Sequence, residues 1–313
     1  MKHAKLFIAL IAICAVMVSC NKEGHYNPKK KISTISYSNY AKEEYWDGSR
    51  WVLLNESLTP RYVGQVWTWN GNLLESIEYR NPEGGSNGID HFIYDGHRLA
   101  SITDDSGRSR KNFVYKSGKL SSIEYYTENT LVAVYNIIHT GNKITGIKYT
   151  AFTGKAAEAR PLPSYVLGLD LPTQLGVTDK STRSASFEYF FEWEGDNVTH
   201  FSCVDQGFVE HQYLTYDKKL NPFRGIWDEF AVSLNSSYCG QAIMSSKNNI
   251  THCKLVQDGD SYEFEHSYSY KGKYPVEDVW TNVSEYYRDD DDLPGDGPYR
   301  YTVVVTKNYE YSE

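Results

Sequence analysis

Residues 94–102 read YDGHRLASI, and this stretch shows the pattern that decides the fold. An aromatic residue comes first, four residues rich in glycine and small polar side chains follow, and the last four positions begin and end with an apolar residue. Four other stretches repeat it: residues 69–77 (WNGNLLESI), 115–123 (YKSGKLSSI), 139–147 (HTGNKITGI) and 193–201 (WEGDNVTHF). The first four of these five copies begin 21 to 25 residues apart, which indicates a repeat protein built from one small structural unit.

Each copy predicts a β-hairpin. The first strand ends on the aromatic residue, and a glycine in the turn accepts the positive φ angle that tight hairpins require. In the second strand, Ile77 and Tyr79 alternate with Glu78, the two-residue period of a half-buried strand. Degenerate copies at residues 245–253 and 270–279 extend the pattern toward the C-terminus.

The repeats together predict an all-β protein, a long antiparallel meander of about fifteen or more strands. Open twisted sheets rarely exceed about ten strands, so we expect a strongly curved or barrel-like sheet. We expect one β-meander domain over residues 31–313. Residues 151–185 contain several prolines and break the alternation, which predicts an irregular insertion. Apolar spacings of three and four predict one short helix near residues 223–235, able to cap or plug one end of the sheet.

The N-terminus has the features of a lipoprotein signal peptide over residues 1–19. Lys2 and Lys5 precede an apolar run at residues 6–18, which is short for a membrane span. The run ends just before Cys20 and resembles a bacterial lipobox. That resemblance implies cleavage before Cys20 and lipid attachment at this residue, which gives a stable membrane anchor. The alternative is an ordinary cleaved signal followed by a chance cysteine.

A second resemblance concerns the residues after Cys20. Residues 21–24 (NKEG) look like the lysine-acidic tag of Bacteroidetes-type lipoproteins, which implies a protein of the outer membrane that faces the cell exterior. Residues 20–30 then form the lipidated cysteine and a polar, flexible tether.

Further along the chain, residues 94–104 resemble a YD (RHS-type) repeat. The phrases at residues 45–48, 216–223 and 246–251 resemble a lipid-anchored Bacteroidetes-type family of unknown function with a porin-like β-meander fold. This resemblance implies a fold but no chemistry. The strands alternate with glutamate, lysine and arginine, so we do not expect insertion into a bilayer.

The charge balance excludes several partners. The chain has 313 residues and a formal net charge of -8, and removal of residues 1–19 leaves 30 basic and 40 acidic residues. Nucleic-acid binding needs clustered positive charge, so we exclude it. Cys203, Cys239 and Cys253 allow at most one internal disulfide, and their spacing is not that of a zinc site. We expect no cofactor.

Candidate site residues are few, because the sequence has no serine-nucleophile elbow and no histidine-based metal motif. The acidic loop with Asp289, Asp291 and Asp296 is a candidate Ca²⁺ site or, in the alternative that we favour, a solvated hairpin loop. Trp227 and Trp280 fall outside the strict repeat frame and are candidates for a ligand-binding surface platform.

These observations predict a surface-exposed outer-membrane lipoprotein that binds an extracellular ligand, such as a glycan, or an envelope protein. We expect a binding protein rather than an enzyme. Two alternatives stay open: a polysaccharide-active enzyme, and a structural scaffold of an outer-membrane complex.

Overall fold

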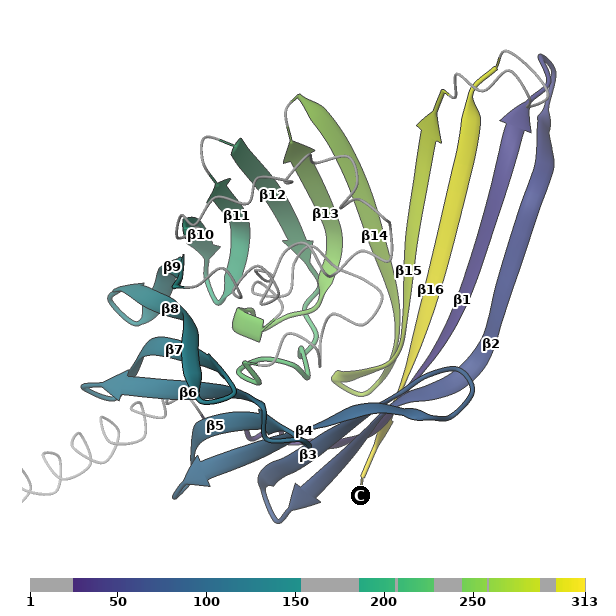
Figure 1. Cartoon of the computed structure of the whole chain (residues 1–313). Helices are drawn as coiled ribbons and strands as arrows, with labels where there is room; N and C mark the ends of the chain where they lie inside the picture. The colour runs from purple at the N-terminus through teal and green to yellow at the C-terminus, as the bar shows by residue number, and fades with distance from the viewer. Residues whose placement is uncertain are drawn as a thin grey trace, which may run out of the picture.

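A computed structural model describes residues 25–152, 186–205, 208–227, 244–257, 259–287 and 297–312. Within these residues, sixteen antiparallel strands form one closed barrel in which each strand pairs with its neighbours in the chain (Figure 1). The strands are β1 Ile32–Trp46, β2 Trp51–Asn70, β3 Leu73–Arg80, β4 Ser86–Asp95, β5 Arg98–Asp104, β6 Ser109–Lys116, β7 Lys119–Thr127, β8 Thr130–Thr140, β9 Lys143–Ala151, β10 Ser186–Glu194, β11 Asn197–Asp205, β12 Phe208–Tyr216, β13 Ile250–Gln257, β14 Asp260–Lys271, β15 Tyr274–Tyr286 and β16 Tyr299–Tyr311.

The barrel closes because β1 pairs with both β16 and β2. Ile35 in β1 is the register partner of Tyr309 in β16 and of Gln65 in β2. Closure pairs both edges of what would otherwise be an open sheet, and exposed edges promote aggregation. The predicted all-β antiparallel meander is therefore confirmed, and the predicted curvature is that of a closed barrel.

A β-bulge at the same place in each repeat explains how apolar residues three positions apart can face the same side of a strand. Two apolar residues three positions apart point to opposite faces of a regular strand. In β5, Leu99 and Ser101 pair with consecutive residues of β4, so Ala100 between them is the extra residue of a bulge. The bulge turns both Leu99 and Ile102 toward the inside of the barrel. The same register shift occurs in the hairpins β2–β3, β6–β7, β8–β9, β10–β11, β12–β13 and β14–β15.

The repeat residues form two apolar layers inside the barrel. Burying a side chain of this size contributes about 1.5–3 kcal/mol, so these layers are the main source of stability. The first apolar position supplies Leu74, Leu99, Leu120, Ile144, Val198 and Ile250, and the second supplies Ile77, Ile102, Ile147, Phe201 and Cys253, all of them buried.

The segment between β12 and β13 closes the end of the barrel that carries the repeat turns. We call its described residues, 217–227 and 244–249, the floor segment. Its backbone is bonded to the wall and to itself, with Leu220 N donating to Lys273 O at 2.9 Å. Phe223 packs against Trp67 and Tyr309, with ring centroids 6.3 and 5.9 Å away. The Tyr26 hydroxyl donates to Pro222 O at 2.8 Å, so the start of the described chain also lies at the floor.

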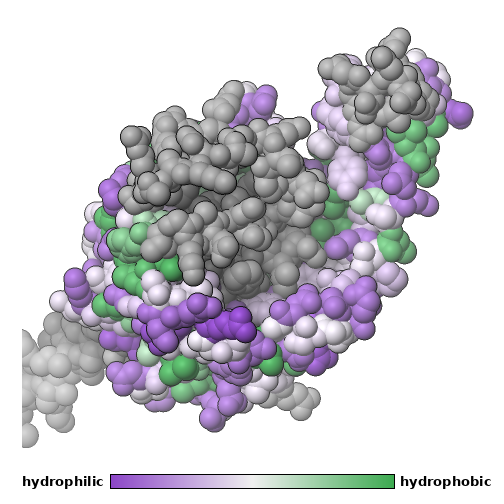
Figure 2. Space-filling model, viewed as in Figure 1, coloured by the Kyte–Doolittle hydropathy of each residue, from purple (hydrophilic) through white to green (hydrophobic). Residues whose placement is uncertain are grey.

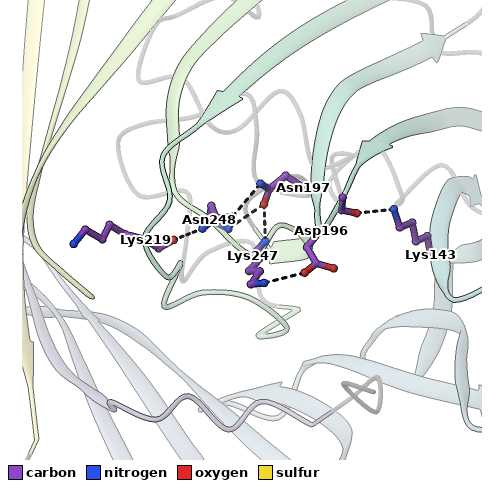
Figure 3. Close-up of polar contacts among 7 residues, drawn as sticks. Lys143, Asp196, Asn197, Lys219, Lys247 and Asn248 are labelled. Carbon is purple, nitrogen blue, oxygen red and sulfur yellow. Dashed lines mark hydrogen bonds and ion pairs between the residues drawn. The ribbon is translucent and has the colours of Figure 1, made fainter. Parts of the chain in front are cut away.

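Polar side chains hold the floor segment to the turn between β10 and β11 (Figure 3). Asn197 Oδ1 accepts hydrogen bonds from the backbone N–H groups of Lys247 and Asn248, both at 3.0 Å. Lys247 Nζ pairs with Asp196 at 3.1 Å, while Lys143 Nζ of β9 donates to Gly195 O at 2.6 Å. These contacts join segments about fifty residues apart in the chain.

The predicted helix near residues 223–235 is not seen in the part that the structure describes. Residues 222–225 form a turn, with Gly225 at φ +89°, and Trp227 has φ +54°, a left-handed conformation that ends any regular helix. Residues 228–235 lie outside the described residues. The apolar spacing that suggested a helix instead places Phe223, Ile226 and Trp227 in the barrel core.

Four strands are longer than most others and extend one side of the barrel. β1 has 15 residues, β2 has 20, and β15 and β16 have 13 each, whereas β3 to β9 have 7 to 11. Figure 1 shows these four strands rising above the rest of the barrel, away from the C-terminus. We call their upper part the tall wall.

The outside of the barrel carries many charged groups. Cross-strand ion pairs join Lys148 to Glu188 and Arg300 to Glu285, both at 2.7 Å. Figure 2 shows hydrophilic residues over much of the coloured surface, with hydrophobic residues in separate groups between them. The repeat layers inside the barrel are therefore apolar, while the described outer face carries many polar groups.

Candidate functional site

The inner face of the tall wall is built by register between strands from the two ends of the chain. Tyr37, Lys307 and Asp278 are cross-strand partners in β1, β16 and β15, and all three are buried, so this face points into the barrel. Alternate residues above them share the face. The next three rows, reading from β15 to β2, are Trp280–Val305–Asn39–Thr59, Asn282–Val303–Ala41–Ser57 and Ser284–Tyr301–Glu43–Asn55.

A hollow of about 60 Å³ lies at this wall and is lined by Ala41, Lys42, Glu43, Asn55, Glu56, Ser57 and Tyr301. Ala41 and Ser57 are cross-strand partners with small side chains, which leave space between the larger polar ones. Glu43, Asn55 and Tyr301 supply a carboxylate, an amide and a phenol at its lining. We call this feature the wall hollow.

The groups of the wall hollow can donate and accept hydrogen bonds toward an uncharged ligand. The Tyr286 hydroxyl donates to Glu43 Oε1, which orients the carboxylate. One row nearer the floor, Asn39 Oδ1 is buried and has no hydrogen-bond partner among the described residues. A buried acceptor without a partner is commonly satisfied by water or a ligand. Asn55 and Ser57 are exposed, so the hollow is open to solvent.

A second polar group, the buried charge cluster, lies where the wall meets the floor segment. His266 Nδ1 and Asp278 Oδ1 are 2.8 Å apart, and their side chains are only 5% and 4% exposed. Lys307 is equally buried, and no hydrogen bond or ion pair joins its ammonium to any described residue. Desolvation lowers the pKa of Lys307, and the nearby Asp278 opposes this shift.

The buried charge cluster borders a cavity of about 20 Å³, lined also by Asn221 and Asn249 of the floor segment. A cavity of this volume holds about one water molecule. The cluster therefore has the groups of an acid–base site but no room for a substrate. In the described structure it places buried charges beside the floor segment.

A third polar group lies on the wall formed by β10 to β12. Gln212 Nε2 donates to Glu210 Oε1 at 2.5 Å, and both side chains are buried. Desolvation raises the pKa of Glu210, which favours its neutral acid form. The Tyr189 hydroxyl is buried without a hydrogen-bond partner among the described residues. Cys203 is its cross-strand neighbour.

The two candidate tryptophans are both buried, so neither offers the surface platform that their sequence positions suggested. Trp227 is 8% exposed, because it lies at the end of the first part of the floor segment and packs into the core. Trp280 is 9% exposed and stacks on Phe264, with ring centroids 5.7 Å apart. A tryptophan side chain packs well against an aromatic ring on a neighbouring strand, which favours its burial in the core. Trp280 does lie in the row directly beneath the wall hollow.

Several other predicted sites lie outside the described residues. These are the lipid-attachment residue Cys20, the acidic-loop candidates Asp289, Asp291 and Asp296, and the insertion from residue 153 to 185. Cys239 also lies outside them, while Cys203 and Cys253 are buried and form no disulfide within the described residues. Across the described ranges, no group of three or more His, Cys, Asp or Glu side chains could hold a metal ion. No helix in these ranges is long and apolar enough to cross a membrane.

Sequence reasoning missed the wall hollow, because Glu43 and Tyr301 lie far apart in the chain and become neighbours only through barrel closure. It also missed the buried charge cluster, for which a signal existed. In the degenerate repeat at residues 270–279, Asp278 occupies the second apolar position. A charge in a slot that is otherwise apolar indicates a buried polar interaction.

Comparisons with known proteins find likenesses among solved structures but none in sequence. No protein-family model and no curated protein matches the sequence, so the YD-like pattern stays a description of the turns. One solved structure is a porin-like protein from Bacteroides uniformis, 10% identical, covering 88% of this chain and 97% of that chain with a TM-score of 0.45. Another is a porin-like protein from Bacteroides vulgatus, 9% identical, covering 91% and 99% with a TM-score of 0.45.

Proposed function

We propose that this chain is a lipid-anchored outer-membrane protein whose wall hollow binds a neutral carbohydrate at the cell exterior. The observation that carries the proposal is the set of polar groups in the hollow. Glu43, Asn55, Ser57 and Tyr301 combine acceptors and donors around a small-residue centre, as recognition of a polyhydroxylated ligand requires. The inner position of Trp280 beneath them adds an apolar surface to the same face.

The position of the N-terminus supports an orientation with the hollow facing away from the membrane. Tyr26 is bonded at the floor and follows Cys20 by six residues. Six extended residues reach at most about 20 Å, so a lipid on Cys20 would hold the floor near the bilayer. The tall wall would then project outward into the medium.

The charged outer face supports attachment by a lipid rather than by the barrel wall. A membrane-spanning barrel presents an apolar band to lipid, whereas the outer ion pairs of Lys148 with Glu188 and of Arg300 with Glu285 would meet hydrocarbon at high cost. The first test is fractionation of cells that produce the wild-type chain or Cys20→Ala. We expect the wild type in the membrane fraction and the variant in the soluble fraction. A Cys20→Ala chain that stays in membranes contradicts the anchor.

The second test concerns the ligand. Thermal unfolding of the full chain in mild detergent is followed with neutral polysaccharides, peptidoglycan fragments and Ca²⁺. A carbohydrate at one hundred times its Kd stabilises the fold by about 2.7 kcal/mol and raises the Tm by a few degrees. Glu43→Gln and Asn55→Ala should each weaken this effect about tenfold or more in Kd. The control is Glu188→Gln, on the outer face of β10 and far from β1, β2 and β16 in the strand order.

The outcomes separate the alternatives. A carbohydrate that binds the control normally and the two hollow variants weakly supports the proposal. A carbohydrate that binds all three variants equally places its site elsewhere and contradicts it. If no carbohydrate in the panel raises the Tm, the proposal is also contradicted. A protein partner would then be tested next.

A further inference from the structure

The outer face of β10 to β12 carries two histidines whose nitrogens face each other. Glu192, His200 and Tyr213 are successive cross-strand neighbours in β10, β11 and β12. His211 precedes Tyr213 by two residues in β12 and therefore lies on the same face. His200 Nε2 and His211 Nδ1 are 3.1 Å apart. This pair takes no part in the wall hollow or in the buried charge cluster.

The neighbours of His200 hold its ring in one orientation. Its Nδ1 lies 3.3 Å from Glu192 Oε1, so the carboxylate lies beside one ring nitrogen while Nε2 faces His211. The ring of Tyr213 stacks on it, with centroids 4.8 Å apart and planes 9° apart. A carboxylate on the far nitrogen of a histidine is the usual support of a metal-binding imidazole.

The spacing of the two nitrogens suits a shared metal ion. Zinc–nitrogen bonds are about 2.0–2.1 Å, so two nitrogens on one ion lie about 2.9–3.4 Å apart at coordination angles of about 90–110°. The imidazole planes differ by 20° and their centroids are 5.2 Å apart, so the rings meet at their nitrogen edges. At 3.1 Å the two nitrogens are within hydrogen-bond distance, and a metal ion would need both lone pairs turned toward one point.

We propose that His200 and His211 bind one divalent transition-metal ion of the imidazole-preferring class, Cu²⁺, Ni²⁺ or Zn²⁺, with water completing the coordination. Cu²⁺ should bind most tightly of the three, following the general order of divalent affinities. Bound metal takes the place of the hydrogen between the rings, and each imidazole stays neutral with its proton on the other nitrogen, Nδ1 of His200 and Nε2 of His211. The nearby positive charge of Lys254, the cross-strand neighbour of Tyr213, is balanced by Glu263 at 3.7 Å.

His252 provides a matched control on the same outer face. It is half-buried and has a carboxylate neighbour, Glu263, at 3.5 Å, but no second imidazole bonds to it among the described residues. The full chain is purified in mild detergent without a histidine tag and titrated with Zn²⁺ and Cu²⁺ by calorimetry. We expect one ion per chain for the wild type and for His252→Ala. His200→Ala and His211→Ala should each weaken binding at least tenfold, and Glu192→Gln should weaken it roughly tenfold.

The opposite results overturn the proposal. It fails if the wild type binds neither ion, if His200→Ala and His211→Ala bind as the wild type does, or if His252→Ala loses binding to the same extent. Far-UV circular dichroism and the metal-free Tm of each variant show whether the barrel is intact. His211→Gln replaces His211→Ala in the comparison if the alanine variant unfolds at a lower temperature.

Discussion

Asp278 shows how a single residue changes the use of a repeat position. Its slot holds isoleucine, phenylalanine or cysteine in sister copies, and those side chains fill the apolar layer. Here the carboxylate is buried instead and meets His266 from the next strand, with Lys307 as its cross-strand neighbour. Burial makes such charges costly unless they compensate one another. The cluster therefore makes the wall–floor junction sensitive to the loss of one partner.

We predict that Asp278→Asn lowers the free energy of unfolding by about 3–5 kcal/mol, because it leaves the Lys307 ammonium buried without a compensating charge. The double variant Asp278→Asn/Lys307→Met should recover most of this loss. Urea unfolding measures the free energy of unfolding of both variants. The outer ion pair of Arg300 with Glu285 gives the control, since Glu285→Gln should change the free energy of unfolding by less than about 1 kcal/mol. An Asp278→Asn chain as stable as the wild type contradicts the charge-compensation account.

Glu210 gives a pH-dependent prediction. Burial raises its pKa, so the folded protein binds this proton more tightly than the unfolded chain does. The associated stability is present below the ordinary glutamate pKa and is lost as pH rises through the raised value. Glu210→Gln should therefore be more stable than the wild type at neutral pH. Its free energy of unfolding should also lack the decrease with rising pH that Glu210 causes. Denaturant unfolding between pH 4 and pH 8, about the range that glutamate shifts cover, measures the difference.

The exposed Glu75→Gln variant is the control for this measurement, because its side chain is in solvent. It should follow the wild-type pH profile. If Glu210→Gln is destabilised at neutral pH and keeps the wild-type slope, the carboxyl group is not the source of the pH dependence.

At the scale of the element, the bulge is what makes the hairpin repeat work. The extra residue, Ala100 in β5, lets two apolar positions three apart face the same side. The turn of the same hairpin uses Gly96 at φ +62°, a conformation that strains any residue with a Cβ. Turn and bulge are both local, and both recur with the period of the sequence.

We predict that deletion of Ala100 leaves the barrel folded, because without the extra residue Leu99 and Ile102 lie two positions apart and a regular strand keeps both on the inner face. Deletion of Ile93, in the regular part of the neighbouring strand, should prevent stable folding, because Phe92 and Tyr94 then face opposite sides. Loss of one buried aromatic side chain alone costs about 3–5 kcal/mol. Soluble yield and thermal unfolding measure both deletions. Equal loss of stability in the two variants would show that the extra residue is itself required for the register.

At the scale of the whole molecule, closure by β1 and β16 brings the two ends of the described chain together at the floor. Ser312 N donates to Lys31 O at 2.9 Å, and Tyr26 lies on the floor segment. The same closure builds the inner face of the tall wall from strands at the two ends of the sequence. The candidate carbohydrate site is thus a product of barrel closure.

We predict that a circular permutant with Ser312 linked to Tyr26 and new ends at Glu83 forms the same barrel. The new ends lie in an exposed turn, and the new link joins residues that are already at one end of the barrel. Its far-UV circular dichroism should match the wild type, with a Tm within a few degrees. A second permutant opened inside β7 at Ile123 should fail to fold. If both permutants fail to fold equally, barrel closure depends on the natural order of the strands in the chain.

The sequence by itself determined the local architecture. Glycine turns, aromatic strand ends and the two-residue alternation recur every 21 to 25 residues, and each is decided by contacts within one hairpin. That is why the all-β meander and its curvature are predictable. The spacing of three between Leu99 and Ile102 also indicates the bulge, because a regular strand cannot bury both residues on one face.

Tertiary structure alone decided where chemistry is concentrated. Glu43 and Tyr301 meet because the first and last strands pair, and their separation of more than 250 residues leaves no local signal. The same reason explains the two tryptophans, since the closed barrel and its floor segment bury Trp227 and Trp280. Local periodicity specifies hairpins, but the register across the closing strands specifies which polar groups share a face.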